Sequence, residues 1–250
     1  MKLRIALPVI LALLAGCVSS GNVDRTKTPE GRREARDAYI QLGLGYLQQG
    51  SPARAKGPLS EALKLDPGST DAHAALALVF QTEMETELAD KHYRSAIAGG
   101  DARVFNNYGS FLFEQGRYPE AYQRFQQAAA DTMYPERARV FQNLGLTALR
   151  LGKREDAKTW FNRSLRLDGR RPVALLELGV MAYEDKDYVP ARRYYDGYSA
   201  ISEQTARSLL LGIRLASVFQ DAERKSNLAL QLKRLYPASA EYKTYLAEQP

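Results

Sequence analysis

Residues 102–130 read ARVFNNYGSFLFEQGRYPEAYQRFQQAAA, and this stretch decides the fold. Its two halves carry apolar residues at helical spacing, and the breaker Gly-Arg-Tyr-Pro at 116–119 separates them. The first half holds Gly109, and the second holds Ala121 twelve residues later and Phe125 four residues after that. Two antiparallel helices that cross closely need a small residue at the crossing, while a large apolar residue fills the space beside it. The stretch therefore predicts a helical hairpin.

The same arrangement returns along the chain with a period close to 34 residues. The first small residue of each unit is Gly43, Ala77, Gly109, Gly145, Gly179 or Gly212. In the first five units a second small residue stands twelve positions later, at Ala55, Ala89, Ala121, Ala157 and Ala191. A large apolar residue follows four positions after it, at Leu59, Tyr93, Phe125, Phe161 and Tyr195. The sixth unit has Arg224 at the second small position, as is common in a terminal unit that caps a stack.

This pattern matches the tetratricopeptide repeat and predicts an all-α protein. We expect six helix-turn-helix units over residues 34–238 that stack into a right-handed superhelical solenoid, because the apolar face of each unit is buried only by the next. Residues 239–250 are expected to form a C-terminal tail or capping helix. A chance periodicity in another helical bundle is the alternative, and the agreement of five units at several positions argues against it.

The N-terminus predicts a secretory signal over residues 1–16. Lys2 and Arg4 precede an apolar run from residue 5 to residue 15, which is shorter than the roughly 20 residues a membrane-spanning helix needs. The run ends in Leu-Ala-Gly before Cys17, which resembles the lipobox of bacterial lipoproteins. Cys17 is the only cysteine in the chain, so no internal disulfide can use it.

The lipobox resemblance implies cleavage before Cys17 and attachment of acyl chains to this residue. The lipidated Cys17 and a flexible, polar tether then occupy residues 17–33. Residue 18 is Val and not the Asp that marks retention in the inner membrane, so the resemblance implies an anchor in the outer membrane. An ordinary secretory signal with an incidental cysteine is the alternative.

The composition offers little chemistry. The formal net charge is +6, but basic residues are interspersed with acidic ones, so nucleic-acid binding is not expected. The two histidines, His73 and His92, lack metal-ligand spacing, and no nucleophile, base and acid recur in a catalytic pattern. We therefore predict no enzymatic activity, no cofactor, no metal and no small-molecule substrate.

A protein-binding groove is the function that the repeats favour. In such a repeat the first helix lines the concave side, with inward positions at the second, fifth, ninth and twelfth residues. In unit one, Ile40, Leu44 and Leu47 form an apolar stripe on this side, while Tyr39, Leu42 and Tyr46 are expected to supply the packing face. The further candidate groove residues are Leu78, Arg103, Asn106, Asn107, Arg139 and Asn143.

Such a groove suits an amphipathic helix or an extended peptide. The polar candidates could bond a peptide backbone. The alternative is that these residues only pack against neighbouring helices, or that the tether folds back over the apolar stripe.

Several strings go beyond the repeat pattern. They include ARDAYIQLGLGYLQ at 35–48, DAHAALA at 71–77, VFQTEME at 79–85, TMYPER at 132–137 and ARSLLLGIR at 206–214. Together they resemble the PilF/PilW-type pilotins, the lipoproteins of type IV pilus biogenesis and stability, over nearly the whole mature chain.

The resemblance implies a lipid-anchored protein at the periplasmic face of the outer membrane of a Gram-negative bacterium. It would bind the secretin of the type IV pilus, escort it to that membrane and promote its multimerisation. The alternative is a repeat-containing lipoprotein that serves as a scaffold for barrel assembly or for peptidoglycan enzymes.

Overall fold

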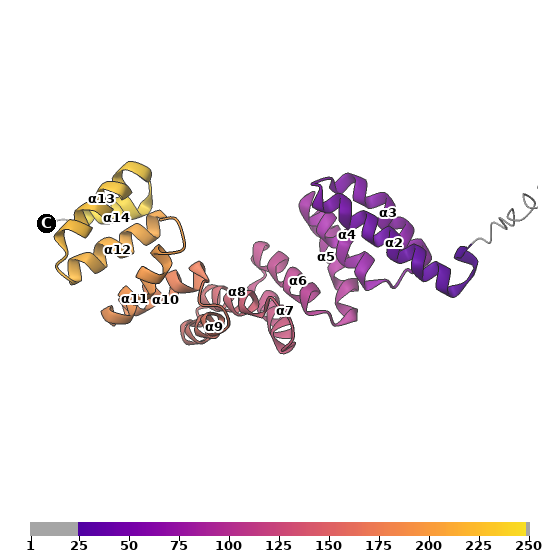
Figure 1. The fold of residues 1–250 in the computed structure, drawn as a ribbon, viewed down its shortest axis with the longest axis horizontal. Coiled ribbons are helices and arrows are strands. Elements are labelled where there is room, and N and C mark those ends of the chain that lie inside the picture. The colour runs from indigo at the N-terminus through magenta and orange to yellow at the C-terminus, as the bar shows by residue number, and fades with distance from the viewer. Residues whose placement is uncertain (1–24, 249–250) are drawn as a thin grey trace, which may run out of the picture.

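A computed structural model describes residues 25–248, and the expected signal peptide, Cys17 and the first part of the tether lie outside them. The described chain is all-helical and confirms the predicted solenoid (Figure 1). Its six hairpins are units one to six: α2 (Pro29–Gln48) with α3 (Pro52–Leu65), α4 (Thr70–Thr82) with α5 (Thr86–Ala96), α6 (Ala102–Glu114) with α7 (Tyr118–Ala130), α8 (Arg137–Arg150) with α9 (Arg154–Leu167), α10 (Pro172–Glu184) with α11 (Tyr188–Ser199), and α12 (Ala206–Val218) with α13 (Ala222–Leu235).

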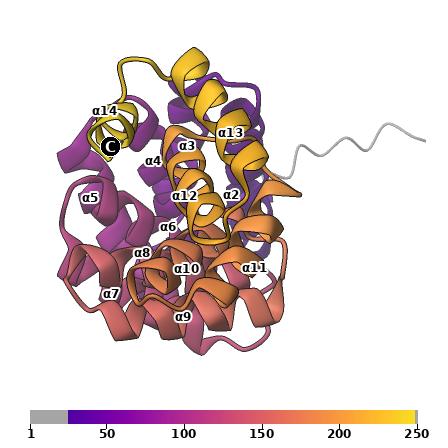
Figure 2. The same ribbon diagram turned by 90° about the vertical axis from the view of Figure 1, so that its left-hand side faces the viewer.

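Three short elements complete the described part. The 3₁₀ helices η1 (Arg25–Lys27) and η2 (Ile97–Gly99) lie before unit one and after α5, and the final helix is α14 (Ala240–Ala247). Units one and six lie at opposite ends of an elongated molecule in Figure 1, and Figure 2 shows the units turning about the long axis. Within residues 25–248, no helix is both long and apolar enough to cross a membrane.

Each hairpin turns through one residue in the left-handed backbone region. Glycine takes this position in three units, at Gly50, Gly116 and Gly152, with φ between 68° and 73°. Met84, Lys186 and Gln220 take it in the others with φ near 60°. Left-handed backbone is strained for a residue with a Cβ atom, which explains why the turns favour glycine.

The small residue of the first helix allows close contact within each hairpin. A Cβ atom built on Gly109 would stand 2.7 Å from Cε1 of Phe125, and one on Gly145 would stand 2.5 Å from Cε1 of Phe161. Such distances are well inside van der Waals contact, so both rings pack directly on the glycine backbone. The spacing seen in the sequence is thus a packing requirement.

Stacking between hairpins depends on the residue that directly precedes the small residue, glycine or alanine, of each first helix. This seventh residue of each unit is Leu76, Tyr108, Leu144, Leu178 or Leu211 in units two to six, and each keeps at most 4% of its surface exposed. Each packs into a cluster that contains residues of the preceding unit. Tyr108, for example, stacks on Tyr93 with ring centroids 5.1 Å apart.

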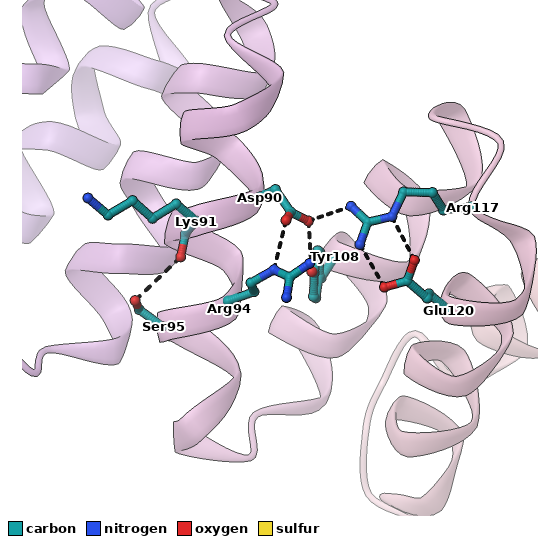
Figure 3. A network of polar contacts seen from close by, with 7 residues as sticks. All are labelled: Asp90, Lys91, Arg94, Ser95, Tyr108, Arg117 and Glu120. Carbon is teal, nitrogen blue, oxygen red and sulfur yellow. Dashed lines mark hydrogen bonds and ion pairs between the residues drawn. The ribbon is translucent and has the colours of Figure 1, made fainter.

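Polar contacts tie unit two to unit three around Asp90 of α5 (Figure 3). Its carboxylate accepts hydrogen bonds from Arg94 at 2.7 Å, from the Tyr108 hydroxyl at 2.8 Å and from Arg117 at 2.7 Å. Arg117 also donates two hydrogen bonds to Glu120. Partial burial opposes ionisation, but the three hydrogen bonds prevail and lower the pKa of Asp90.

The expectation for the packing face of unit one is wrong for Tyr39 and Leu42, whereas Tyr46 is half-buried and packs against a core cluster as expected. Tyr39 is 37% exposed and Leu42 is 48% exposed, whereas Ile40 keeps only 4% of its surface. The reason is the position of unit one in the stack. Tyr39 and Leu42 face the end of the solenoid, where the described residues contain no preceding hairpin, while Ile40 faces unit two and packs on Ala62 and Ala72.

The other end of the solenoid is covered. Helix α14 packs on α12, and its residues Tyr242 and Tyr245 lie against the buried Leu209 and Ile213. The Arg214 guanidinium of α12 pairs with Glu248, just beyond α14, at 2.5 Å.

Candidate peptide-binding surface

The first helices of units one to three form a hollow on the surface of about 200 Å³. It is lined by Asp37, Ile40, Gln41 and Leu44 of α2, Asp71 and Ala75 of α4, and Arg103 of α6. Three of the predicted groove residues, Ile40, Leu44 and Arg103, therefore lie together. Gln41 and Ala75 stand at the sixth position of their units, one residue after an inward position, and the sequence analysis missed them.

The hollow combines an apolar floor with a charged rim. Ile40 is buried with 4% of its surface exposed and Leu44 is half-buried, so Leu44 supplies more of the apolar surface that a ligand could contact. On the rim, Arg103 lies 3.7 Å from Asp71, a long ion pair between exposed side chains that contributes little to stability. Such a pair is easily rearranged by an incoming charged group. The arrangement suits one face of an amphipathic helix or a short apolar peptide segment.

A second hollow of about 180 Å³ lies further along the solenoid. Ser110, Phe113, Glu114, Phe125, Asn143 and Leu146 line it. Ser110 and Phe113 occupy the ninth and twelfth positions of unit three, and Leu146 occupies the ninth of unit four. The inward positions of the repeat, which predicted Leu44, could therefore have predicted these three residues as well.

Two predicted polar residues bond to each other at this second hollow. Nδ2 of Asn143 donates to Oδ1 of Asn106 at 3.2 Å, and Asn106 is 3% exposed. The hydrogen bond joins units three and four and fixes both amide groups. A peptide would therefore meet a preformed amide pair with Asn143 as its more accessible member.

The other predicted residues do not join either hollow. Arg139 is exposed, pairs with Glu136 at 3.5 Å and lines a separate hollow with Arg137 and Arg171 between the loops before α8 and α10. Leu47 and Leu78 are half-buried and pack against core clusters. Asn107 is half-buried as well. The predicted set is thus divided among several places along the molecule.

The histidines form a pair inside unit two. Nδ1 of His73 lies 2.9 Å from Nδ1 of His92, and Nε2 of His73 lies 3.1 Å from the carbonyl oxygen of Pro67. The carbonyl can only accept, so Nε2 of His73 carries a proton and its Nδ1 accepts from His92. Burial first, and then the proximity of His73 and Lys91, lower the pKa of His92 to about 4. Among residues 25–248, no group of three or more His, Cys, Asp or Glu side chains could hold a metal ion.

Six stacked helical hairpins, whose first helices line hollows on the surface, define a tetratricopeptide-repeat protein. Two tetratricopeptide-repeat family models match the chain, one at residues 100–169 and one at residues 143–204. The chain is also 57% identical over 252 residues to the type IV pilus assembly protein PilF of Pseudomonas aeruginosa, with full coverage of both sequences.

Solved structures agree with this match. A structure from a functional characterisation of Pseudomonas aeruginosa PilF has a TM-score of 0.82 and 58% identity and covers 88% of this chain and 100% of that chain. The crystal structure of PilW, described as a widely conserved type IV pilus biogenesis factor, has a TM-score of 0.68 and 27% identity and covers 84% of this chain and 98% of that one. The chain belongs to the PilF/PilW family, which confirms the resemblance drawn from the sequence.

Proposed function

We propose that the protein is a lipid-anchored pilotin of type IV pilus biogenesis. It binds a subunit of the pilus secretin, carries it to the outer membrane and promotes its multimerisation there. The full-length identity of 57% with a type IV pilus assembly protein carries this proposal. The hollow on α2, α4 and α6 supports the binding step, and the lipobox-like sequence before Cys17 supports the anchoring step.

The mechanism is escort by binding, with no covalent change in the partner. The hollow on α2, α4 and α6 receives an apolar segment of the secretin, and the acyl chains at Cys17 hold the pair at the membrane. Each buried methylene adds about 0.8 kcal/mol of membrane affinity, so several acyl chains anchor a protein that one chain holds only marginally. The periplasmic face of the outer membrane of a Gram-negative bacterium follows as the location.

The binding step is tested by Leu44→Glu, with Val189→Glu as the matched control. Val189 is 64% exposed on α11 and lies outside the hollow. A carboxylate in an apolar contact is expensive to bury, so Leu44→Glu should weaken binding of the purified secretin subunit at least tenfold. Val189→Glu should bind like the wild type. Equal binding by all three proteins would remove the hollow from the proposal.

The anchoring step is tested by Cys17→Ala in cells. The variant should stay folded, leave the outer-membrane fraction and reduce secretin multimers and twitching motility, while bulk porins stay unchanged. Normal outer-membrane fractionation of the variant would refute the lipid assignment. Loss of porins or capture of peptidoglycan hydrolases without secretin would favour the scaffold alternatives.

A further inference from the structure

A basic hollow of about 360 Å³ lies between the loops before α8 and α10. We call it the arginine hollow, because Arg137, Arg139 and Arg171 line it. Its acidic lining residues are Glu136 and Asp168, so the charged side chains leave a formal net charge of +1. The arginine hollow is larger than the two hollows described above and shares no lining residue with either. The proposed function gives it no role.

One wall of the arginine hollow is the loop between α7 and α8. This loop has six residues, 131–136, whereas the loop between α9 and α10, which forms the other wall, has four, 168–171. The longer loop contains most of the string TMYPER at 132–137, which goes beyond the repeat pattern, and all of that string except residue 133 lines the hollow. A part of the sequence that the repeat leaves unexplained therefore lies at this hollow.

The acidic residues of the hollow do not satisfy its arginines. Nε of Arg139 lies 3.5 Å from Oε2 of Glu136, and Nη1 of Arg171 lies 3.9 Å from Oδ2 of Asp168. Both distances exceed the roughly 2.7–3.2 Å of a hydrogen bond. Nε of Arg171 is buried and has no hydrogen-bond partner within residues 25–248. Because a guanidinium group has five N–H donors, the hollow has donors left for a further acceptor.

The backbone favours a negative charge at the same place. Helix α8 begins at Arg137 and α10 begins at Pro172, so the N-termini of both helices border the hollow. Neither helix has an acidic residue in its first turn or a side-chain cap at its N-terminus. The partial positive charge of a helix N-terminus therefore adds to the charge of the arginines, and a bound anion would be stabilised by both.

Exposed apolar side chains beside the arginines indicate which kind of anion fits. Leu167 lines the hollow and is 55% exposed, and Met133 on the longer loop is 85% exposed. A free inorganic anion gains nothing from these two side chains. A peptide with an apolar residue next to Asp or Glu can contact them while its carboxylate pairs with a guanidinium group. One such carboxylate also neutralises the formal charge of the hollow.

We propose that the arginine hollow binds an acidic segment of a partner protein. A carboxylate of that segment pairs with Arg139 and Arg171, and a neighbouring apolar side chain lies against Leu167. The arginine hollow is thus a second docking site, on units four and five, in addition to the hollow on α2, α4 and α6. The inference goes beyond the proposed function and does not require that the partner be the secretin.

The binding of acidic segments is tested with an array of short synthetic peptides and the full mature protein. Each peptide has one Asp or Glu beside an apolar residue, and its counterpart has Asn or Gln in place of the acid. At least one acidic peptide should bind roughly tenfold more tightly than its amide counterpart, because a charged acceptor strengthens the bonds from guanidinium groups. Equal binding of every acidic peptide and its counterpart would overturn the proposal.

Substitutions then locate the bound peptide. Arg139→Gln removes an exposed guanidinium group and should weaken binding of the best acidic peptide roughly fivefold. Arg234→Gln is the matched control and should bind as the wild type does, because Arg234 is exposed on α13 and lies outside the hollow. Leu167→Ala should weaken binding about threefold through the loss of apolar contact. Equal binding by the wild type and Arg139→Gln would overturn the proposal.

Competition distinguishes a protein segment from other anions. Inorganic phosphate, and glycerol phosphate as a soluble lipid headgroup, should displace the peptide only at concentrations far above that of the peptide. Displacement at equal concentrations, unchanged by Leu167→Ala, would overturn the protein partner in favour of a simple anion or a headgroup. None of these measurements uses the secretin, so a failure of secretin binding would count against the proposed function alone.

Discussion

The two ends of the solenoid differ in how they are finished. At the C-terminal end, α14 covers the apolar side of α12, so Leu209 and Ile213 keep at most 3% of their surface exposed. At the N-terminal end, Tyr39 and Leu42 of α2 stay exposed although their counterparts within the stack are covered or buried. A repeat protein needs a cap at each end to be soluble and stable. The comparison teaches that, within residues 25–248, the stack has a cap at its C-terminal end and none at its N-terminal end.

The largest effect is expected where the stacking residue is covered. Leu144→Ala removes a fully buried side chain between units three and four and should lower the free energy of unfolding by about 3 kcal/mol. Leu42→Ala changes the equivalent residue at the open end and should cost about 0.5 kcal/mol. Denaturant unfolding of both variants measures the difference. Similar losses in the two would mean that the open end is covered in solution.

Removal of α14 should make the two ends alike. Truncation after Pro237 exposes Leu209 and Ile213, and we expect a loss of about 2 kcal/mol in the free energy of unfolding because their burial is partly undone. Leu246→Ala is the matched control, since Leu246 is 53% exposed on the same helix. A truncated protein as stable as the wild type would show that α14 does not cap the stack.

A smaller effect is expected at the polar junction between units two and three. Asp90→Ala leaves Arg94, Tyr108 and Arg117 without their shared acceptor. The free energy of unfolding should therefore fall by about 1.5 kcal/mol. Glu61→Ala is the control, because its contact with Lys64 is an exposed pair within one helix. Hydrogen exchange should localise the loss for Asp90→Ala at the α5–α6 boundary. Equal losses of unfolding free energy for the two variants would mean that the Asp90 network contributes no more than an exposed ion pair.

The smallest effect concerns pH and the histidine pair of unit two. His92 is neutral in the folded protein with a pKa of about 4, below the ordinary value of 6.5, so the unfolded chain binds the extra proton first as pH falls. The contribution of the histidine pair to the free energy of unfolding is therefore complete above about pH 6.5, and it declines as the pH falls toward 4. The titratable groups nearest the ring are His73 of α4 and Lys91 of α5, and Lys56 of α3 lies over Phe80, which stacks on His92.

Melting curves between pH 7.5 and pH 5 measure this contribution. His92→Gln keeps a donor for Nδ1 of His73 but does not titrate, so its stability should fall less steeply than that of the wild type. The slope for one proton is at most about 1.4 kcal/mol per pH unit, and partial solvent exposure makes it smaller. Parallel curves for the two proteins would contradict the role of His92.

The candidate site could be predicted only in part. The register of the repeat placed Ile40, Leu44 and Arg103 on one side, and the structure brings these three together. It could not show that Asn106 is bonded to Asn143, or that Arg139 lines another hollow. The spacing of residues within one helix determines which side chains face inward. Which of those side chains contact one another depends on how far one unit is rotated relative to the next.

The sequence by itself determined the hairpin. Gly109 and Phe125 must meet because helical spacing and one tight turn put them opposite each other, and only a glycine leaves room for the ring. The tertiary structure alone decided which apolar face of α2 is covered. Ile40 and Leu42 are equally apolar in sequence, but unit two covers Ile40 and no described element covers Leu42. Burial is a property of neighbours in space, so it depends on where a unit stands in the stack and cannot be found in the unit itself.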